Sequence, residues 1–260
     1  MILSIIIVNY NNFGQVLSCL KSIGQFLLNI NHEIIIIDNK SKNKLDNYII
    51  KDFDECIILK NNRNIGFARA VNQGFKKAKG RIILILNPDV KIIPGSVEKA
   101  INFLETNSDV GILLPKLLNV DGTLQYSCRR FYTLPVLMFR RSPLNKFRPI
   151  SRMIERHLMM DVSHDTVMEV DWGLGACMFI RRSVINGGQI FDERFFLYFE
   201  DVDLCFRMKQ KGFKVIYFPE AVMIHAHMRQ SARSFLNRAK WEHFISLLKF
   251  LLKHKRLKPR

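Results

Sequence analysis

The sequence lacks cysteines at the spacings that bind metals or form redox pairs. Its five cysteines are scattered and odd in number, and none of them stands in a C-x-x-C arrangement. This pattern predicts neither a disulfide framework nor a zinc site, and it fits a protein of a reducing compartment.

Long apolar runs and acidic residues are also scarce. No apolar run approaches the length that crosses a bilayer, and no basic leader precedes the strand-like residues Leu3 to Val8, so we expect a cytoplasmic protein without a transmembrane anchor. The chain has 23 Asp and Glu against 40 Lys and Arg, a formal net charge of +17. This excess favours polyanionic partners, namely nucleotide phosphates, an anionic lipid surface or nucleic acid, and the charge alone does not choose among them.

Apolar runs that end in polar residues mark the strands of the predicted fold. The clearest run, Ile82 to Leu86, stops at Asn87-Pro88-Asp89 and is typical of a buried parallel strand. Apolar residues at helical spacing follow the runs, which predicts an α/β fold with a mostly parallel, doubly wound sheet and helices on both faces. Two further runs end in the same way: Leu3 to Val8 at Asn9 and Tyr10, and Glu33 to Ile37 at Asp38 and Asn39.

The polar strand ends predict where a ligand binds. In open α/β sheets, ligands lie beyond the carboxyl ends of the strands, so Asp89 stands where a ligand or a metal holding one is expected. Asn, Pro and Asp also favour turns, and the tripeptide alone leaves simple turn chemistry as an alternative.

The second half of the sequence has a different character. Residues 121–171 are rich in Arg and Pro and predict a basic, flexible insert without regular structure, either a mobile flap over the site or a solvated surface loop. Residues 170–180 then predict another strand. Carboxylates and aromatic rings are concentrated from Phe191 to Leu204, with Glu200, Asp201 and Asp203 where a helix begins. A helix dipole accounts for one or two of these acids, but hardly for all of them.

Residues 231–260 predict a basic amphipathic helix. Its apolar stripe consists of Trp241, Phe244, Leu248 and Leu251, and lysines and arginines surround its end. Such a helix suits an anionic membrane surface, and packing of the stripe onto the core domain is an equal alternative.

Six short motifs together resemble the family 2 glycosyltransferases of the GT-A fold, and most closely their rhamnosyltransferase-like branch. The resemblance extends from residue 4 to about residue 231, and it implies one GT-A domain over residues 1–230. Residues 1–115 would then be the nucleotide-sugar-binding half and residues 172–230 the acceptor and catalytic half. The motifs are Val8-Asn9-Tyr10-Asn11, Asp38-Asn39-x-Ser41, Asn62-x-Asn64-x-Gly66-Phe67-Ala68-x-Ala70-x-Asn72-x-Gly74, Asn87-Pro88-Asp89, Gly173-x-Gly175-Ala176 and Phe195-x-x-Tyr198-x-Glu200-Asp201-x-Asp203.

The resemblance implies a set of residues that bind the nucleotide-sugar donor. Asp38 resembles the family's pyrimidine or ribose contact, and the free backbone N–H groups of the helix that opens at Asn64 would face the donor. A buried acid satisfied by turn amides, and simple capping of that helix, are the alternatives. The implied donor-binding residues are Asn9, Tyr10, Asp38, Asn39, Arg63, Asn64, Gly66, Phe67, Asn87 and Asp89.

The resemblance also implies a divalent cofactor, Mg²⁺ or Mn²⁺. Asp89 resembles the last residue of the family's D-x-D motif, whose carboxylate holds the cation against the diphosphate. His225, or the nearby His227, resembles a further metal or diphosphate contact. The chain departs from the motif at Asn87, which leaves one carboxylate where two are usual.

The catalytic residues follow from the same resemblance. Asp201 resembles the base that deprotonates the acceptor hydroxyl, and Glu200 would orient the base or the acceptor. Trp172, Gly173 and Asp203 are the expected acceptor-binding residues. Core packing of Trp172 and a helix-start role for Asp203 are the alternatives.

The resemblance implies an inverting, metal-assisted transfer of a sugar, specifically L-rhamnose, from a dTDP- or UDP-sugar. The implied acceptor is a hydroxyl of a glycan, or of a glycan linked to a polyprenyl diphosphate, in bacterial cell-surface polysaccharide synthesis at the inner face of the cytoplasmic membrane. A nucleotidyltransferase is the enzyme alternative, but Asn9-Tyr10-Asn11-Asn12 lacks its Gly-rich, basic phosphate loop. A nucleic-acid-binding module is the second alternative, although the basic residues are not interleaved with aromatic residues in a recognisable motif, so we expect no nucleic-acid partner.

Overall fold

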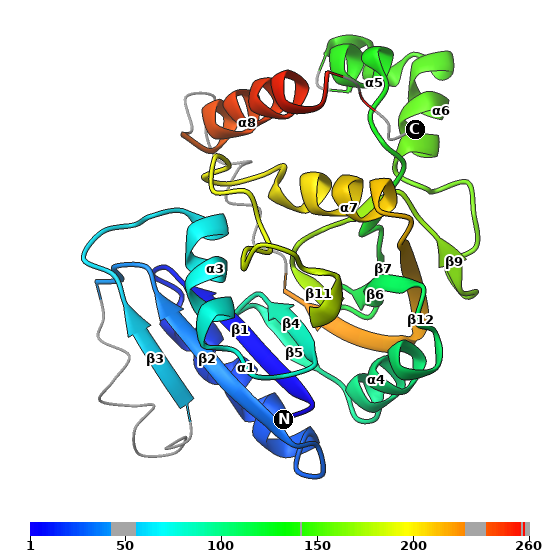
Figure 1. Ribbon diagram of the computed structural model, residues 1–260. Helices are drawn as coiled ribbons and strands as arrows, with labels where there is room; N and C mark the ends of the chain where they lie inside the picture. The colour runs from blue at the N-terminus through cyan, green and yellow to red at the C-terminus, as the bar shows by residue number, and fades with distance from the viewer. Residues whose placement is uncertain (43–55, 141, 227–237, 256, 258–260) are drawn as a thin grey trace.

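The computed structural model describes residues 1–42, 56–140, 142–226, 238–255 and 257, and it shows an α/β fold built on one mixed sheet (Figure 1). The main sheet has ten strands in the order β3-β2-β1-β4-β11-β6-β12-β5, with β7 beside β6 and β9 beside β12, and β10 and β8 form a separate pair. The strands are β1 Leu3–Asn9, β2 His32–Asp38, β3 Cys56–Lys60, β4 Ile82–Leu86, β5 Val90–Ile92, β6 Val110–Leu118, β7 Leu124–Gln125, β8 Cys128–Arg129, β9 Met168–Glu169, β10 Trp172–Gly173, β11 Cys177–Arg181 and β12 Lys214–His225.

The helices cover the two faces of this sheet. On β1, the side chain of Ile6 packs into the same core cluster as α3 and α7, whereas its neighbours Ile5 and Ile7 pack into the cluster that holds α1 and α4. Successive side chains of a strand point to opposite faces, which explains the division. The helices are α1 Phe13–Phe26, α3 Phe67–Lys77, α4 Ser96–Thr106, α5 Leu134–Phe139, α6 Arg148–His157, α7 Glu200–Gln210 and α8 Arg238–His254, and the 3₁₀ turns are η1 Pro143–Lys146 and η2 Arg182–Val184.

Strand pairing brings the predicted ligand-binding ends together. β1 pairs in parallel with β2 and β4, and β2 pairs in parallel with β3, with Asn9 in register with Asp38. β11 runs antiparallel between β4 and β6, so the N-terminal and C-terminal parts of the chain share one sheet. The predicted α/β architecture, with a mostly parallel sheet and helices on both faces, is confirmed.

The prediction that residues 121–171 have no regular structure is wrong. The segment contains β7, β8, α5, η1, α6 and β9. Its prolines begin helices instead of interrupting them, because Pro135 and Pro149 each occupy one of the first two positions of α5 and α6. Proline suits that position, where the N–H has no intrahelical partner to lose. Thr133 also caps α5 by accepting a hydrogen bond from the N–H of Val136.

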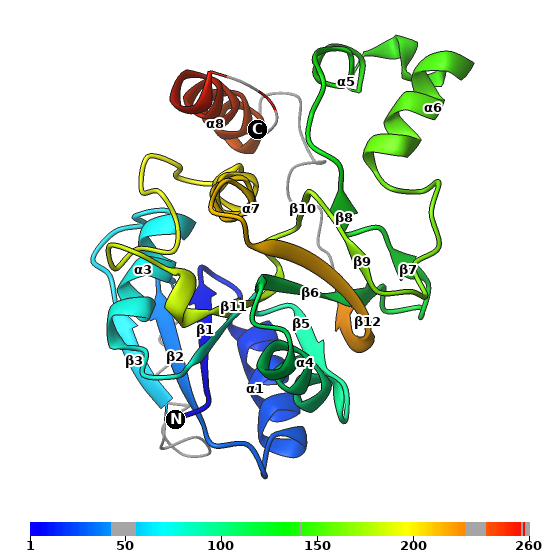
Figure 2. The same ribbon diagram turned by 45° about the vertical axis from the view of Figure 1, so that its right-hand side comes forward.

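The C-terminal helix α8 packs onto α7, at the same end of the molecule as α5 and α6 (Figures 1 and 2). Its buried residue Phe250 lies edge-on against Phe206 of α7, with ring centroids 5.5 Å apart. The predicted apolar stripe does not form this contact, since Trp241, Phe244 and Leu248 remain exposed. None of the helices in the described residues is long and apolar enough to cross a membrane.

Candidate active site

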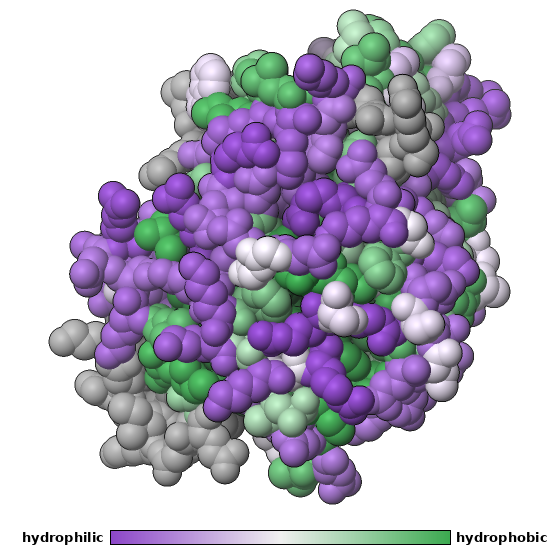
Figure 3. Space-filling view, viewed as in Figure 1, coloured by the Kyte–Doolittle hydropathy of each residue, from purple (hydrophilic) through white to green (hydrophobic). Residues whose placement is uncertain are grey.

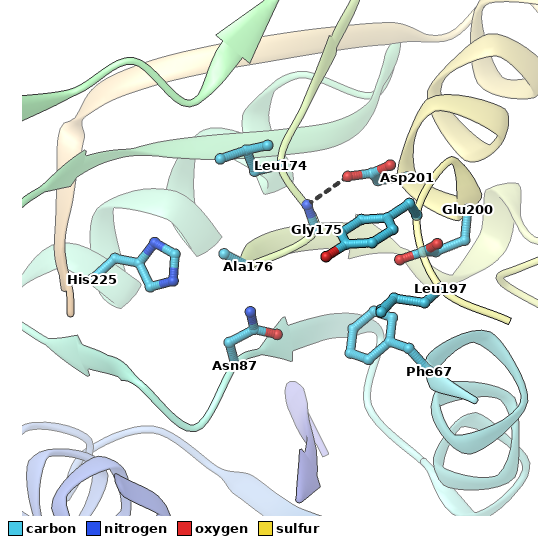
Figure 4. Close-up of a pocket in the computed structure, with 10 residues that line it drawn as sticks. Phe67, Asn87, Leu174, Gly175, Ala176, Leu197, Glu200, Asp201 and His225 are labelled. Atoms are coloured by element: carbon cyan, nitrogen blue, oxygen red, sulfur yellow. Dashed lines mark hydrogen bonds between the residues drawn. The ribbon is translucent and has the colours of Figure 1, made fainter. Parts of the chain in front are cut away.

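A pocket of about 190 Å³ lies beyond the ends of β4 and β12, between the β10–β11 turn and the start of α7 (Figure 4). Five residues predicted from the sequence meet there, although they come from four separate parts of the chain: Phe67, Asn87, Glu200, Asp201 and His225. Figure 4 shows Glu200 and Asp201 on one side of the pocket and His225 on the other. The remaining lining residues are Leu174, Gly175, Ala176, Leu197 and Tyr198.

The two acids at the start of α7 have different environments. The Oδ2 atom of Asp201 accepts a hydrogen bond from the N–H of Gly175 at 3.1 Å, and its Oδ1 atom accepts one from the N–H of Val202 at 2.8 Å. Burial raises the pKa of Asp201, and these hydrogen bonds together with the charge of Arg129 oppose the rise. Backbone donors stabilise a carboxylate, so they reduce the rise that burial causes, although the pKa of Asp201 remains above its usual value.

Glu200 has weaker support, because only its own backbone opposes the rise in its pKa. Burial, and then the negative charge of Asp201, raise the pKa of Glu200 well above its usual value. Its buried Oε2 atom has no hydrogen-bond partner among the described residues. Of the two neighbouring acids, Glu200 therefore holds a proton more tightly, and Asp201 is the one suited to accept a proton during a reaction.

The acid pair is held by an unusual backbone. Tyr198 and Phe199, directly before Glu200, have φ angles of +67° and +65°. Two consecutive non-glycine residues in the left-handed region cost on the order of 1–3 kcal/mol each, and such strain persists only where the surroundings impose it. The segment that leads to this pair is bound to α3: the N–H of Phe67 donates to the carbonyl of Phe196 at 2.8 Å, and the buried side chain of Asn72 donates to the carbonyl of Phe191 at 2.8 Å.

Asp89 and His225 form the candidate metal site. Asp89 lies just before β5, and its Oδ1 atom is 3.3 Å from Nε2 of His225 at the end of β12. Nδ1 of the same ring is 2.6 Å from Oε1 of Gln125, so that a proton on Nδ1 leaves Nε2 directed at the carboxylate. An imidazole nitrogen and a carboxylate oxygen at this separation fit two adjacent ligands of one cation. The described residues contain no group of three or more His, Cys, Asp or Glu side chains arranged to hold a metal. His227 lies outside the described residues.

Asn9 and Asp38 lie side by side at the ends of β1 and β2. Oδ1 of Asp38 accepts hydrogen bonds from Nδ2 of Asn9 at 3.1 Å and from the N–H of Ser41 at 3.2 Å. The side chain of Asn9 is buried, so its hydrogen bond holds the carboxylate of Asp38 in a fixed position. Oδ2 of Asp38 makes no hydrogen bond with any residue that the structure describes. Tyr10, the next residue, is exposed beside this pair.

A network of amides joins this region to the start of α3. Nδ2 of Asn39 donates to Oδ1 of Asn64 at 2.9 Å, and Oδ1 of Asn39 accepts from the N–H of Ile65 at 3.1 Å. Gly66 has a φ of +89°, and a Cβ there would lie 2.6 Å from the carbonyl oxygen of Phe196, so only glycine fits.

The expectation that the N–H groups at this helix start are free for a donor needs a correction. The N–H of Gly66 donates to Oδ1 of Asn64 at 3.0 Å, and the N–H of Phe67 donates to the carbonyl of Phe196 at 2.8 Å. These bonds connect α3 to the acidic segment, and the aromatic ring of Phe67 is what reaches the pocket. Arg63 is exposed and does not line the pocket.

None of the three expected acceptor-binding residues lines the pocket. Trp172 is only 4% exposed, stacks on Tyr132 and donates its indole N–H to the carbonyl of Arg130 at 3.1 Å. Gly173 packs against Leu114, and a Cβ atom on Gly173 would lie only 2.4 Å from Cδ1 of Leu114. Core packing thus overrides sugar stacking for Trp172.

Asp203 points away from the pocket into an ionic cluster with α7 and α8. Its Oδ2 atom is 2.8 Å from Nε of Arg207, and its Oδ1 atom is 2.5 Å from Nζ of Lys253 and 2.7 Å from Nε2 of His254. Burial would raise the pKa of Asp203, but the His254 hydrogen bond and the charges of Arg207 and Lys253 outweigh burial and lower it. Asp203 therefore connects α7 to α8 and does not line the pocket.

Several residues of the site carry no role in the sequence-based prediction. Gly175 and Tyr198 lie in two of the motifs named above, and their membership of a motif identifies them as candidates for the site. Gln125 and Arg129 lie in the insert, where no sequence pattern marks Gln125 and only its charge marks Arg129. Gln125 nevertheless contacts His225, and the charge of buried Arg129 acts on Asp201. Burial lowers the pKa of Arg129 to about 10, which leaves it cationic at neutral pH.

Known proteins resemble this chain over most of its length. Residues 4–171 match the family described as Glycosyl transferase family 2. An N-acetylglucosaminyl-diphospho-decaprenol L-rhamnosyltransferase of Mycobacterium tuberculosis is 25% identical over 77% of this chain and 68% of its own length. The rhamnosyltransferase WbbL of Escherichia coli is 29% identical over 76% of this chain and 72% of its own length.

Solved structures show the same fold. GalNAc-T7 with UDP, GalNAc and Mn²⁺ superposes with a TM-score of 0.66 at 17% identity, over 88% of this chain and 44% of that one. The mannosyltransferase PcManGT of Pyrobaculum calidifontis, in complex with GDP-Man and Mn²⁺, gives a TM-score of 0.60 at 16% identity over 88% of this chain and 57% of its own. The chain thus spans less than two thirds of these two structures. The fold is GT-A, the nucleotidyltransferase alternative is set aside, and the chain belongs to glycosyltransferase family 2.

Proposed function

We propose that this glycosyltransferase transfers a sugar with inversion of configuration, with Asp201 as the base that deprotonates the acceptor hydroxyl. The observation that carries the proposal is the pocket in which Glu200 and Asp201 face His225 and Asn87 across the ends of the strands (Figure 4). Direct displacement at the sugar needs one carboxylate opposite the leaving group. The backbone donors from Gly175 and Val202 aim Asp201 and favour its ionised form.

Glu200 supports the base without replacing it. A protonated Glu200 beside Asp201 adds no second negative charge and can donate a hydrogen bond to the acceptor or to Asp201. The strained backbone at Tyr198 and Phe199 then serves to present both acids to the pocket.

The nucleotide of the donor would lie along the ends of β1 and β2. The pocket of about 190 Å³ is smaller than the usual range of roughly 300–1,000 Å³ for ligand sites, so it accommodates the reacting sugar and not the whole donor. Oδ2 of Asp38, which makes no hydrogen bond with a described residue, would contact the ribose or base, and exposed Tyr10 offers a ring for stacking. Arg63, Asn64 and Asn39 stand beside this path.

Asp89 and His225 are the residues that would hold Mg²⁺ or Mn²⁺. When bound, such a cation neutralises the charge that develops on a diphosphate leaving group. Gln125 orients the imidazole of His225, and Asn87 lines the pocket between this pair and the acids. The single Asp in the N-P-D sequence makes Asp89 the one carboxylate that this motif supplies.

The relatives support a more specific substrate assignment. Two rhamnosyltransferases match most of the chain, and the mycobacterial one is named for an acceptor joined to decaprenol through a diphosphate. We infer that this chain transfers L-rhamnose from a dTDP- or UDP-sugar to a glycan acceptor linked to a polyprenyl diphosphate. Such an acceptor sits in a membrane, and we place the protein on the inner face of the cytoplasmic membrane, with exposed Trp241, Phe244 and Leu248 of α8 toward the lipid.

The test is nucleotide release from a panel of dTDP-, UDP- and GDP-sugars, each with Mg²⁺, Mn²⁺ or EDTA. The proposal expects one preferred donor, dependence on the cation, and loss of turnover in both Asp89→Ala and Asp201→Asn. If no donor turns over, membrane extracts are added to supply the acceptor. Absence of donor binding by calorimetry as well would show that the proposed function is wrong.

A further inference from the structure

A second and larger pocket lies within the insert, between α6 and the chain that leads from β8 into α5. Its volume is about 480 Å³, which is within the range of small-molecule sites. Its polar lining includes Arg130, Arg152, Arg156 and His157, and its apolar lining includes Val136 and Met153. Among the residues that the structure describes, no acidic side chain lines it.

The arginines of this pocket are only partly neutralised. Arg130 is 2.6 Å from Oδ1 of Asp161, and Arg156 lies 3.9 Å from the other oxygen of the same carboxylate. Arg152 is exposed and makes no ion pair with any residue in the described ranges. One carboxylate is thus shared by two of the three guanidinium groups, which leaves a positive potential suited to an anionic ligand.

His157 is the polar side chain at the base of the pocket. It is 3% exposed, and neither ring nitrogen has a hydrogen-bond partner among the described residues. Burial, and then the charges of Arg140 and Arg129, lower the pKa of His157 to about 3; the nearby backbone of Arg130 and Phe131 opposes this, without hydrogen-bond geometry to the ring. The neutral ring has one N–H donor, and a buried donor without a partner is costly. A ligand oxygen that accepted this N–H would remove the cost.

Apolar surface borders the positive pocket. Besides Val136 and Met153 inside it, four large apolar side chains of the same segment are more than half exposed: Leu134, Met138, Leu144 and Phe147. Hydrophobic side chains are visible at this upper end of the molecule among hydrophilic ones (Figure 3). A molecule that fits such a site carries an anionic group beside an apolar chain.

The pocket is connected to the catalytic acids through β8 and Tyr132. Arg129 and Arg130 are neighbours in the chain, and the charge of Arg129 acts on Asp201 while Arg130 lines the second pocket. The ring of Tyr132 lies 4.6 Å from the ring of His157 and 5.4 Å from the ring of Phe199, the residue before Glu200. The second pocket therefore lies on the α7 side of the catalytic site, the side that carries the proposed base Asp201.

We propose that the pocket between α5 and α6 binds the diphosphate of an acceptor whose diphosphate is esterified to an apolar chain. This inference rests on the proposed function and deepens it by assigning the residues that recognise the acceptor. Arg152 and Arg156 bind the diphosphate oxygens, the N–H of His157 donates to one of them, and Val136 and Met153 contact the first part of the chain. The exposed apolar residues of α5 and η1 lie along the route of the chain toward a lipid surface.

The test is calorimetric binding of farnesyl diphosphate, below its critical micelle concentration, to the full chain. Inorganic diphosphate, farnesol and phosphatidylglycerol vesicles are the comparison ligands. Farnesyl diphosphate should bind at least about tenfold more tightly than inorganic diphosphate or farnesol, and Arg152→Gln should weaken it about tenfold, since hydrogen bonds between charged groups are strong. The NMR signal of the His157 ring should shift on binding.

The matched control is Arg148→Gln, which removes an exposed arginine of the same helix that does not line the pocket and should leave binding unchanged. If Arg148→Gln and Arg152→Gln lowered the affinity for farnesyl diphosphate equally, or if the protein bound only the vesicles, the binding would be a general attraction to a basic surface, and the proposal would be wrong. If inorganic diphosphate bound as tightly as farnesyl diphosphate, the apolar chain would not contribute to binding, and the proposed amphiphilic ligand would be wrong. Hydrolysis of the sugar nucleotide by the unaltered protein, without acceptor, tests the proposed function separately, so either can fail while the other stands.

Discussion

The N–H of Gly175 donates a hydrogen bond to Oδ2 of Asp201 at 3.1 Å and so joins the β10–β11 turn to the first residues of α7. The Cβ atom that Gly175 lacks would lie 3.5 Å from Cβ of Asp201, so the two backbones approach closely. This contact fixes the direction of one carboxylate oxygen, and the N–H of Val202 fixes the other.

Replacing Asp201 by Asn should therefore remove catalysis and retain the fold. The amide keeps the shape of the side chain but cannot take the acceptor proton, so kcat should fall by about 10²- to 10⁴-fold, the usual contribution of a general base. Donor affinity, measured by calorimetry, should stay close to that of the unaltered protein. Asp109→Asn, at an exposed carboxylate paired with Lys214, is the control and should retain full activity. Equal activity of the two variants would remove Asp201 from the proposed role.

Glu200→Gln should change stability in a pH-dependent way. The pKa of Glu200 is raised by burial in the folded protein, so the folded state binds more protons than the unfolded state between the two pKa values. Stability then decreases as pH rises through this window. Gln removes that dependence, so the variant should be as stable as the unaltered protein at acidic pH and more stable at alkaline pH. Thermal unfolding from pH 4 to 9 measures this.

The control for that experiment is Glu155→Gln, since Glu155 is an exposed residue of α6. Its unfolding temperature should follow that of the unaltered protein at every pH. A Glu200→Gln variant that loses stability as pH rises with the same slope as the unaltered protein would contradict the protonated state of Glu200.

Gln125→Ala should weaken cation binding although Gln125 is not an expected ligand. Its Oε1 atom, 2.6 Å from Nδ1 of His225, orients the ring toward Asp89. Loss of such an outer partner lowers metal affinity by about 10- to 100-fold. Binding of Mn²⁺ to the protein with UDP, followed by electron paramagnetic resonance, gives the affinity without turnover. The control is Gln189→Ala, at an exposed position, which should bind Mn²⁺ as the unaltered protein does. An unchanged Mn²⁺ affinity in Gln125→Ala would mean that His225 is not a ligand of the cation.

The sequence is sufficient to predict the strands and several pocket residues, because these depend on local pattern. Ile82 to Leu86 is buried, as its continuous apolar pattern predicts. The rule that ligands bind beyond the ends of parallel strands then identifies the polar residues after it as candidates for ligand binding. By contrast, the antiparallel insertion of β11 between β4 and β6 is not encoded in the apolar pattern of residues 177–181, which fits either direction.

Side-chain direction was the harder property to predict. Asp201 and Asp203 are two residues apart on one helix, yet the first lines the pocket and the second faces α8, because successive helical positions differ by about 100°. The orientation of Trp172 likewise depends on its contact with Tyr132, a residue that is remote from it in the sequence. A motif identifies such residues but does not give the partner that buries them.

Asp203→Asn should destabilise the protein through α8. The carboxylate of Asp203 is fully buried, and two cationic side chains, those of Arg207 and Lys253, and the ring of His254 contact it. The substitution takes the carboxylate away from Arg207, whereas Lys253 keeps its ion pair with Asp192 at 2.8 Å. Loss of one partner of a buried ion pair typically costs about 3–5 kcal/mol, and the remaining pair places this variant toward the lower end of that range. Because the pKa of Asp203 is lowered on folding, its contribution is present above the unfolded-state pKa and is lost as pH falls through the folded-state pKa.

Urea unfolding at pH 7 measures this effect, and hydrogen exchange locates it. The exchange of amides in α8 should increase more than that of amides in β1 or β4, because Phe250 and Asp203 connect α8 to α7. Asp165→Asn, at an exposed carboxylate paired with Lys116, should leave the urea midpoint unchanged, since exposed ion pairs contribute little. A midpoint for Asp203→Asn equal to that of Asp165→Asn, with α8 still protected, would mean that apolar packing around Phe250 holds the helix without the ionic cluster.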